Sequence, residues 1–351
     1  MKRWKVTFGL FLLLFALATT VACAETKEAK MDWNDRTVIF AQPGETIHFT
    51  YDVPEDFVVT KEEWLWYFAY TDGHGSFGSG SNDDEYGATH FESYTYEPTG
   101  IHVEWDGKGS ISLSANEMVR IQLRLNGYEY LYAYVLVADP AEYYTYEIQN
   151  GEATITGYNK DLLRRKVLIP QEIEGYPVTT IGDRAFSDMP SGIGKEFYIP
   201  DNVTTFGKEA FAGSAYLDAV RMPQKLTKMG EGVFAACLQM HFLEIPDSLT
   251  EIPDEAFVNC WGYGAGRGDY SVEQCIGKNV TKIGKSAFAG CWNMGRAWGD
   301  ARLPEKLESI GEGAFQYCYK IKSLEIPAGV TVIPDRTFQG WNPFRLMAIL
   351  R

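Results

Sequence analysis

The second half of the chain repeats one short pattern, and this repeat constrains the fold more than any other feature. The pattern reads Ile-Pro, Val/Leu-Thr, Ile-Gly or Ile-Pro, Ala-Phe and then Cys, and one full copy runs from Ile245 to Cys260. Its phenylalanine recurs after 25, 23, 23, 31, 27 and 23 residues, at Phe186, Phe211, Phe234, Phe257, Phe288, Phe315 and Phe338. A fixed period in this range indicates stacked coils that contact only their neighbours, not a compact globule.

Each copy predicts the same local structure. Residues before Ile-Pro alternate in character, as in Leu324-Glu325-Ile326, which predicts a short strand that the proline ends. The next Ile-Gly opens a bend, and we expect a helical turn that buries Ala-Phe, with the cysteine three residues later on the same side. Stacked strands and phenylalanines would then form one continuous core.

The residue pattern of the repeat also resembles that of a known family. Residues 175–186, Gly-Tyr-Pro-Val-Thr-Thr-Ile-Gly-Asp-Arg-Ala-Phe, are typical of the first units of BspA-like leucine-rich repeats, and about seven copies cover residues 165–341. This resemblance implies a curved, right-handed leucine-rich-repeat solenoid. It also implies a surface location and adhesion to other proteins or cells.

The first residues have the pattern of an export signal. Lys2, Arg3 and Lys5 precede an apolar run from Val6 to about Ala22, so residues 1–24 are interpreted as a signal peptide. Thr20-Val21-Ala22-Cys23 resembles a bacterial lipobox, which would make Cys23 a lipid attachment site. Cleavage after Ala24 without a lipid stays open as the alternative. Either interpretation places the mature protein outside the cytoplasm, and only a lipid on Cys23 would hold it to a membrane.

Residues 25–34 are polar and are interpreted as a tether, and residues 35–138 predict an all-β module. Its strands are β-branched and aromatic, as at Thr37–Phe40, Trp64–Tyr70 and Tyr128–Val137. Strand number and length suit an immunoglobulin-like sandwich, and residues 41–46 resemble bacterial modules of that kind. Asp139-Pro140 marks the boundary to the solenoid, residues 139–351. The expected fold is therefore mixed: a β-sandwich followed by a solenoid with a strand and a helical turn in each repeat.

Charge narrows the class of partner. The formal net charge is −15, and residues 25–140 carry most of it, with 7 basic and 21 acidic residues. Nucleic-acid recognition needs the opposite sign, so we expect no nucleic-acid partner.

The candidate binding site is the row of residues just before each Ile-Pro. In leucine-rich repeats this row lines the concave face, which is the usual ligand face. Two longer spacings, after Phe257 and Phe288, add insertion loops as further contact candidates. The alternative is that Arg221 beside Glu244 and Arg302 beside Glu325 are cross-strand charge pairs that only solubilise the sheet. The predicted ligand contacts are Tyr198, Arg221, Phe242, Glu244, Arg302 and Glu325.

Cysteines form a second pattern. Four follow the repeat phenylalanine by three residues, and we favour a buried ladder over a metal or redox set because no zinc-like spacing accompanies them. They are Cys237, Cys260, Cys291 and Cys318. Cys275 instead lies in the row expected to face solvent, where it either pairs with Cys260 or remains a free thiol.

Tyrosines alternate along one expected strand, at Tyr128, Tyr130, Tyr132 and Tyr134. They form either an exposed aromatic stripe or one row of an ordinary sandwich. The five histidines are scattered and no nucleophile, zinc-hydrolase or phosphate-binding motif occurs. We therefore expect no catalytic residue, metal or cofactor.

The sequence favours an exported binding or adhesion protein whose ligand is an extracellular protein or glycan. The alternatives are a structural spacer of the cell envelope and, less in keeping with the residues, a secreted glycan-active enzyme. Such an enzyme would need a convergent carboxylate pair, and none can be identified.

Overall fold

The structure is a computed structural model of the 351-residue chain. It describes residues 26–31, 37–41, 46–51, 57, 62–69, 79–80, 101–105, 109–113, 118–126, 129–163, 165–241, 243–263, 275–294, 301–321, 323–341 and 347–350. Cys23, Phe242 and the insertions at 264–274 and 295–300 lie outside these residues. Within the described chain, no helix is long and apolar enough to span a bilayer.

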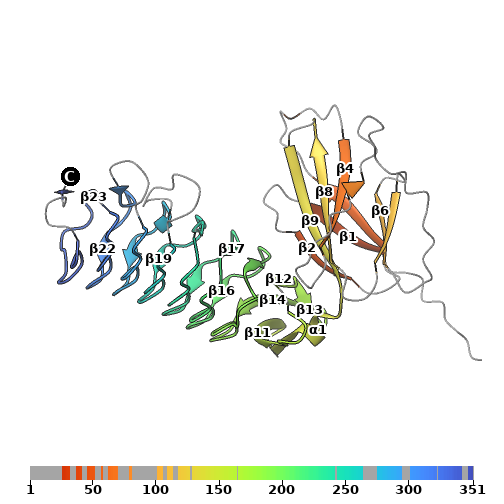
Figure 1. The fold of residues 1–351 in the computed structure, drawn as a ribbon, viewed down its shortest axis with the longest axis horizontal. Coiled ribbons are helices and arrows are strands. Elements are labelled where there is room, and N and C mark those ends of the chain that lie inside the picture. The colour runs from red at the N-terminus through yellow and green to blue at the C-terminus, as the bar shows by residue number, and fades with distance from the viewer. Residues whose placement is uncertain are drawn as a thin grey trace, which may run out of the picture.

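The N-terminal part contains two β-sheets (Figure 1). One has the order β1-β3-β6-β7, formed by Thr26–Met31, Thr46–Tyr51, Ile101–Trp105 and Gly109–Leu113. The other has the order β2-β9-β8-β4-β5, formed by Thr37–Ala41, Glu129–Val137, Met118–Leu125, Glu62–Ala69 and Ser79–Gly80. Asn126, with a φ of 53°, begins the turn between β8 and β9, and asparagine is among the residues that tolerate this left-handed conformation.

The predicted strands of this module are confirmed, but the tether is wrong. Residues 25–34 contain β1, which pairs in parallel with β3 and buries Met31. The polar composition of residues 25–34 suggested a tether, but an edge strand needs few apolar residues on its outer face. The immunoglobulin-like assignment stays a prediction, because β1–β3 and β3–β6 are parallel pairs whereas immunoglobulin sheets are antiparallel.

A short helix and a hairpin connect the module to the solenoid. Helix α1, Pro140–Tyr143, begins at Asp139, whose side chain accepts a hydrogen bond from the Ala141 amide. Strands β10, Tyr144–Gln149, and β11, Glu152–Tyr158, then form a hairpin, and β11 pairs in parallel with β14. The hairpin therefore covers the first edge of a solenoid sheet that would otherwise be open.

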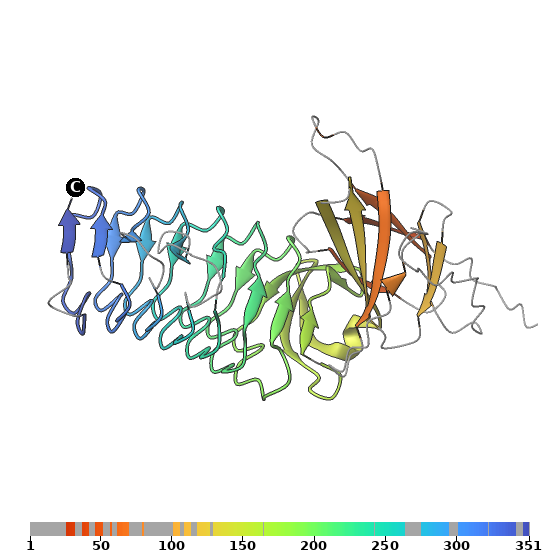
Figure 2. The ribbon, with the colours of Figure 1, turned by 45° about the horizontal axis from the view of Figure 1, so that its top comes forward.

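Two parallel ladders of short strands run along the stacked coils (Figure 2). The residues before each Ile-Pro are called here the strand face and form two separate three-stranded sheets. One is β12-β15-β17, at Lys166–Leu168, Glu196–Tyr198 and Ala219–Arg221, and the other is β21-β23-β24, at Ala301–Arg302, Ser323–Ile326 and Met347–Leu350; the two coils between them, with Glu244 and Cys275, have no strand here. The second row also consists of two sheets. The hairpin sheet continues through β14, β16 and β18, at Tyr176–Ile181, Thr205–Phe206 and Lys228–Met229, with β13, Glu172–Ile173, paired to β14, and a separate sheet contains β19, β20 and β22, at Glu251–Ile252, Lys282–Ile283 and Ser309–Ile310. The last residues of the chain thus continue the strand face, since β24 pairs with β23.

The phenylalanine spine is confirmed. Phe211 stacks on Phe234 with ring centroids 5.0 Å apart, and Phe257 stacks on Phe288 at 5.2 Å. Spine rings from Phe186 to Phe315 are fully buried in a core that runs through the coils. Burial of this repeated apolar surface is what holds neighbouring coils together.

The predicted helical turn around Ala-Phe is wrong. In that segment alternate amides donate to the next coil and not to the residue four positions back: the Arg184, Phe186 and Asp188 amides bond to the carbonyls of Lys208, Ala210 and Ala212. Arg184 and Asp188 have φ angles of 55° and 53°, which no α-helix contains. The Ala-Phe spacing resembles a helix face, but stacking redirects its hydrogen bonds between coils.

Candidate binding face of the solenoid

The strand face positions one outward row on successive coils. In β17 Val220 is buried while Arg221 is exposed, because successive residues of a strand point to opposite sides. Glu244 is exposed in the next coil, and Arg302 is exposed on β21. Of the predicted contacts, Arg221, Glu244 and Arg302 therefore reach solvent and Glu325 is partly buried, while Phe242 lies outside the described residues.

Tyr198 does not belong to this open row, which corrects the prediction. It is 4% exposed because Tyr134 of the N-terminal sheet covers it, with ring centroids 4.5 Å apart. The Tyr134 hydroxyl donates to the Tyr198 hydroxyl at 3.2 Å, which in turn donates to Glu196 at 3.3 Å. Lys166 places its ammonium 5.4 and 5.6 Å from the two ring centroids. A long-range contact thus closes the first part of the face, and Tyr134 is buried rather than part of an exposed stripe.

The sequence pattern places Cys275 in a row that faces solvent, and this prediction is wrong. It is fully buried, and the Tyr263 hydroxyl donates to its carbonyl oxygen at 2.7 Å. Burial raises the pKa of its thiol to about 12. Cys260 and Cys275 are both free cysteines in the structure.

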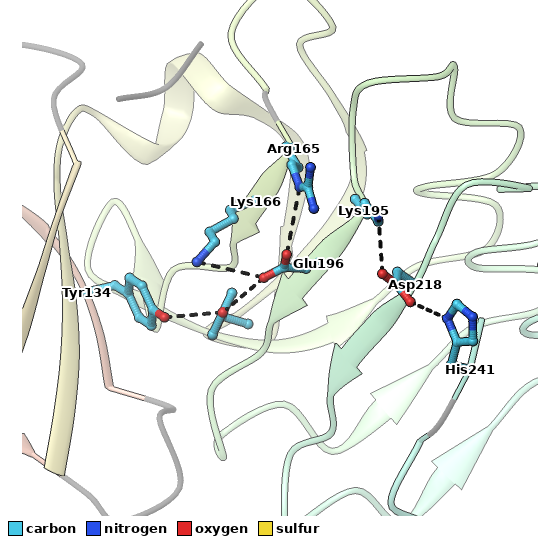
Figure 3. Close-up of polar contacts among 8 residues, drawn as sticks. Tyr134, Arg165, Lys166, Lys195, Glu196, Asp218 and His241 are labelled. Atoms are coloured by element: carbon cyan, nitrogen blue, oxygen red, sulfur yellow. Dashed lines mark hydrogen bonds and ion pairs between the residues drawn. The ribbon is translucent and has the colours of Figure 1, made fainter. Parts of the chain in front are cut away.

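Charged side chains form short chains along the strand face (Figure 3). Glu196 lies 3.8 Å from Arg165 and 3.7 Å from Lys166. Asp218 lies 3.4 Å from Lys195 and 2.5 Å from the Nδ1 atom of His241. These contacts join neighbouring coils, so part of the charge on this face is paired before a partner arrives.

The predicted Arg302–Glu325 pair is confirmed. The two residues are in register between β21 and β23, and the Arg302 Nε atom lies 2.9 Å from a Glu325 carboxylate oxygen. The Arg302 side chain remains 57% exposed and that of Glu325 only 15%. Partly exposed pairs of this kind contribute little stability, so the guanidinium remains available to a ligand.

The cysteine ladder is buried as predicted, and the structure adds a reason for it. Each thiol donates to the carbonyl oxygen of the spine phenylalanine in the preceding coil. The contacts are Cys237 to Phe211 at 3.2 Å, Cys260 to Phe234 at 2.9 Å, Cys291 to Phe257 at 3.1 Å and Cys318 to Phe288 at 3.2 Å.

The same slot holds other donors elsewhere in the solenoid. The Ser214 hydroxyl donates to the Phe186 carbonyl at 2.7 Å, and the Trp341 indole donates to the Phe315 carbonyl at 2.7 Å. An unpaired buried carbonyl is costly, so what the slot requires is a donor and not a thiol as such. This finding supports a structural role for the ladder.

The chemistry of the ladder agrees with that role. Burial raises the pKa of Cys237 and of Cys291 well above the usual thiol range, with a smaller contribution from neighbouring cysteines, and it also raises the pKa of Cys318. Neutral buried thiols are poor nucleophiles and poor metal ligands. Among the described residues, no three histidine, cysteine or acidic side chains converge as metal ligands would.

Sequence reasoning missed two features of the surface. One is the Lys195–Asp218–His241 chain, whose members lie four residues before Ile199, Met222 and Ile245. The second is a group of exposed aromatic residues four positions after the spine phenylalanine, at Trp261, Trp292 and Tyr319. Aligning the repeats by their phenylalanines would have revealed both.

Comparisons with known proteins agree on the repeat. The family model described as "BspA type Leucine rich repeat region" matches six copies over residues 168–263 and 271–347, against the seven expected. No curated protein matches the chain.

Solved bacterial leucine-rich-repeat proteins are similar to part of the chain. One from Treponema pallidum is 24% identical, with a TM-score of 0.36, 54% of this chain covered and 72% of that one. One from Bacteroides ovatus is 26% identical, with a TM-score of 0.45, and the similarity spans 56% of this chain but 49% of the relative. One from Bacteroides capillosus is 30% identical, with a TM-score of 0.30, 36% of this chain covered and 92% of that one.

Proposed function

Because the repeat region of this chain belongs to the BspA-type leucine rich repeat family, we propose that the protein is an exported, cell-surface binding protein. Its partner is an extracellular protein or glycan, and its role is adhesion. The family consists of repeat proteins without known catalysis, and we propose no catalytic role for this chain. The signal-like residues 1–24 support export, either as a secreted protein or with a lipid on Cys23.

The observation that carries this proposal is the open strand face from β17 onward. Arg221 on β17 and Glu244 project from two successive coils, and Arg302 on β21 projects from the coil beyond buried Cys275; the β17 and β21 backbones pair with β15 and β23. A rigid array of charges of both signs is suited to select a partner by electrostatic complementarity. Because Tyr134 covers Tyr198, we place the ligand contacts on β17 and the later coils and not at the start of the face.

A binding experiment tests the proposal directly. Purified mature protein is titrated against immobilised matrix proteins, mucin and whole cells, and Arg221→Ala and Arg302→Ala are compared with Lys228→Ala. Lys228 is an exposed cation on β18 of the other ladder and is the matched control. We expect saturable binding that the two strand-face substitutions weaken and the control leaves unchanged, with a smaller effect at high salt.

The spacer alternative gives the opposite result. If none of these surfaces is bound, or if the strand-face and control variants bind equally, the strand face is not the adhesive surface. Mass spectrometry of the mature N-terminus separates the two export routes, since a lipid on Cys23 adds a mass that cleavage after Ala24 cannot give.

A further inference from the structure

Exposed aromatic side chains from three successive coils lie together at one edge of the solenoid. Trp261, Trp292 and Tyr319 each follow the spine phenylalanine of their coil by four residues, and they are 41%, 43% and 51% exposed. Tyr317, two residues before Tyr319, is exposed as well. These four residues are called here the aromatic stripe.

The stripe is ordered by contacts among its own rings. Trp261 and Trp292 stack with centroids 4.8 Å apart and planes 8° from parallel, and Trp292 lies 6.2 Å from Tyr319 at a tilt of 56°. Tyr317 and Tyr319 have centroids 6.0 Å apart. The Asn293 side chain also donates to the Trp261 carbonyl at 2.7 Å and ties two of the coils together. A partner would therefore meet a surface that needs little further ordering.

Charge distinguishes this edge from others on the same solenoid. Other edges carry ion pairs between coils, such as Arg184–Glu209 at 2.7 Å and Lys208–Glu231 at 3.2 Å. The four stripe residues and neighbouring Asn293 are uncharged, and the exposed cation Lys320 follows Tyr319 in the sequence. Aromatic enrichment with depletion of charge is the composition of the centre of a protein–protein interface.

The ring geometry favours one of the two classes of partner that the proposed function leaves open. A sugar stacks on an open aromatic face, but Trp261 and Trp292 each cover one face of the other and Tyr319 lies 6.2 Å from Trp292, which leaves fewer open faces than separated rings would. Ring edges suit apolar side chains and carbonyl groups instead. We propose that the aromatic stripe is a docking site for an uncharged, apolar segment of a partner protein.

This inference rests on the proposed binding function but uses a different surface from the strand face. Four rings exposed to this degree present roughly 300–400 Å² of largely apolar area, about half of one side of a standard interface. The stripe is therefore suited to weak, reversible docking of a short segment. It would add to contacts made elsewhere on the solenoid.

The test selects random dodecapeptides on phage against the purified mature protein and measures the affinity of synthetic versions of the selected peptides. The variants are Trp261→Ala/Trp292→Ala and Tyr319→Glu, with Tyr176→Ala as the matched control, since Tyr176 is an exposed aromatic residue on β14. We expect peptides with an uncharged apolar centre. Their affinity should fall at least about tenfold in both stripe variants and stay unchanged in the control. Tyr319→Glu keeps the test valid if the double variant does not fold.

Three results would overturn the inference. The first is that selected peptides bind the stripe variants and wild type equally. The second is that soluble cellulose and laminarin oligosaccharides, and not peptides, bind through the two tryptophans. The third is that sedimentation shows the stripe to mediate pairing of two copies of the chain. An Arg221→Ala variant that still binds the peptides but loses matrix binding separates this site from the strand face. Its behaviour also distinguishes failure of the docking site from failure of the proposed function.

Discussion

The interior and the surface of the same coils follow opposite rules. Inside, each position keeps one role from coil to coil: the spine phenylalanines stack at 5.0–5.6 Å between Phe186 and Phe315, and from Phe211 onward a donor follows three residues later. Outside, the same positions change from coil to coil, as where Arg221 is followed by Glu244 and then by buried Cys275. The repetition specifies the fold, and the variation is where recognition of a partner can arise.

The largest effect expected from this comparison is the loss of one spine ring. Phe234 is fully buried between Phe211 and Phe257, with centroids 5.0 and 5.5 Å away. Phe234→Ala leaves a cavity in a core that cannot collapse from both sides, and we expect a loss of roughly 3–5 kcal/mol in the free energy of unfolding. Urea unfolding followed by circular dichroism measures it. A loss below that of an exposed substitution such as Lys228→Ala would contradict the continuous core.

Alkaline pH should act on the interior and leave the surface largely unaffected. Burial raises the pKa of four thiols above the unfolded value of about 8.5, namely those of Cys237, Cys275, Cys291 and Cys318. Their contribution to the free energy of unfolding is therefore complete below that pH and is lost as the pH rises toward the folded pKa. At about pH 9 the unfolded thiols are mostly ionised while unfolded tyrosines are not, so together the thiols should cost about 3 kcal/mol relative to pH 7.

Urea midpoints at the two pH values, measured under reducing conditions, test this expectation. The matched control is Cys237→Ser, which replaces a titrating donor with one that does not titrate in this range and should lose less stability between the two pH values. Equal stability of the wild type at both pH values would show that the thiols are not as enclosed as their burial indicates.

A smaller effect concerns the donor slot behind the spine. Cys260→Ala removes the group that donates to the Phe234 carbonyl at 2.9 Å and leaves a buried acceptor unpaired, which should cost about 1–3 kcal/mol. Cys260→Ser should lose less, because Ser214 fills the same slot and donates at 2.7 Å. The difference between the two variants in urea unfolding isolates the hydrogen bond. Equal losses would mean that the slot requires only volume.

The sequence predicts whatever depends on the repeat period alone. The strands before Ile-Pro, the spine and the buried thiols follow from residue spacing, because each coil contacts only its neighbours. The period does not reveal contacts between distant segments: Tyr134 covers Tyr198 across 64 residues, and β1 pairs with β3 despite its polar composition. Nor does it distinguish a helical turn from hydrogen bonds between coils, since both place Ala-Phe and the next cysteine on one side.

The smallest expected change in stability concerns the surface, where the same substitution should have its effect on binding instead. Arg302→Ala removes an ion pair of 2.9 Å whose guanidinium is 57% exposed, and we expect a loss of about 0–1 kcal/mol that shrinks as salt is added. Arg336→Ala, which breaks the 3.9 Å pair with Glu312 away from the strand face, is the matched control. If the surface carries recognition, both variants should unfold at nearly the same urea concentration as wild type, while only Arg302→Ala weakens partner binding. An Arg302→Ala variant that loses more than about 2 kcal/mol would make this pair part of the structural core, and the contrast between interior and surface would fail at the position where it is most directly measurable.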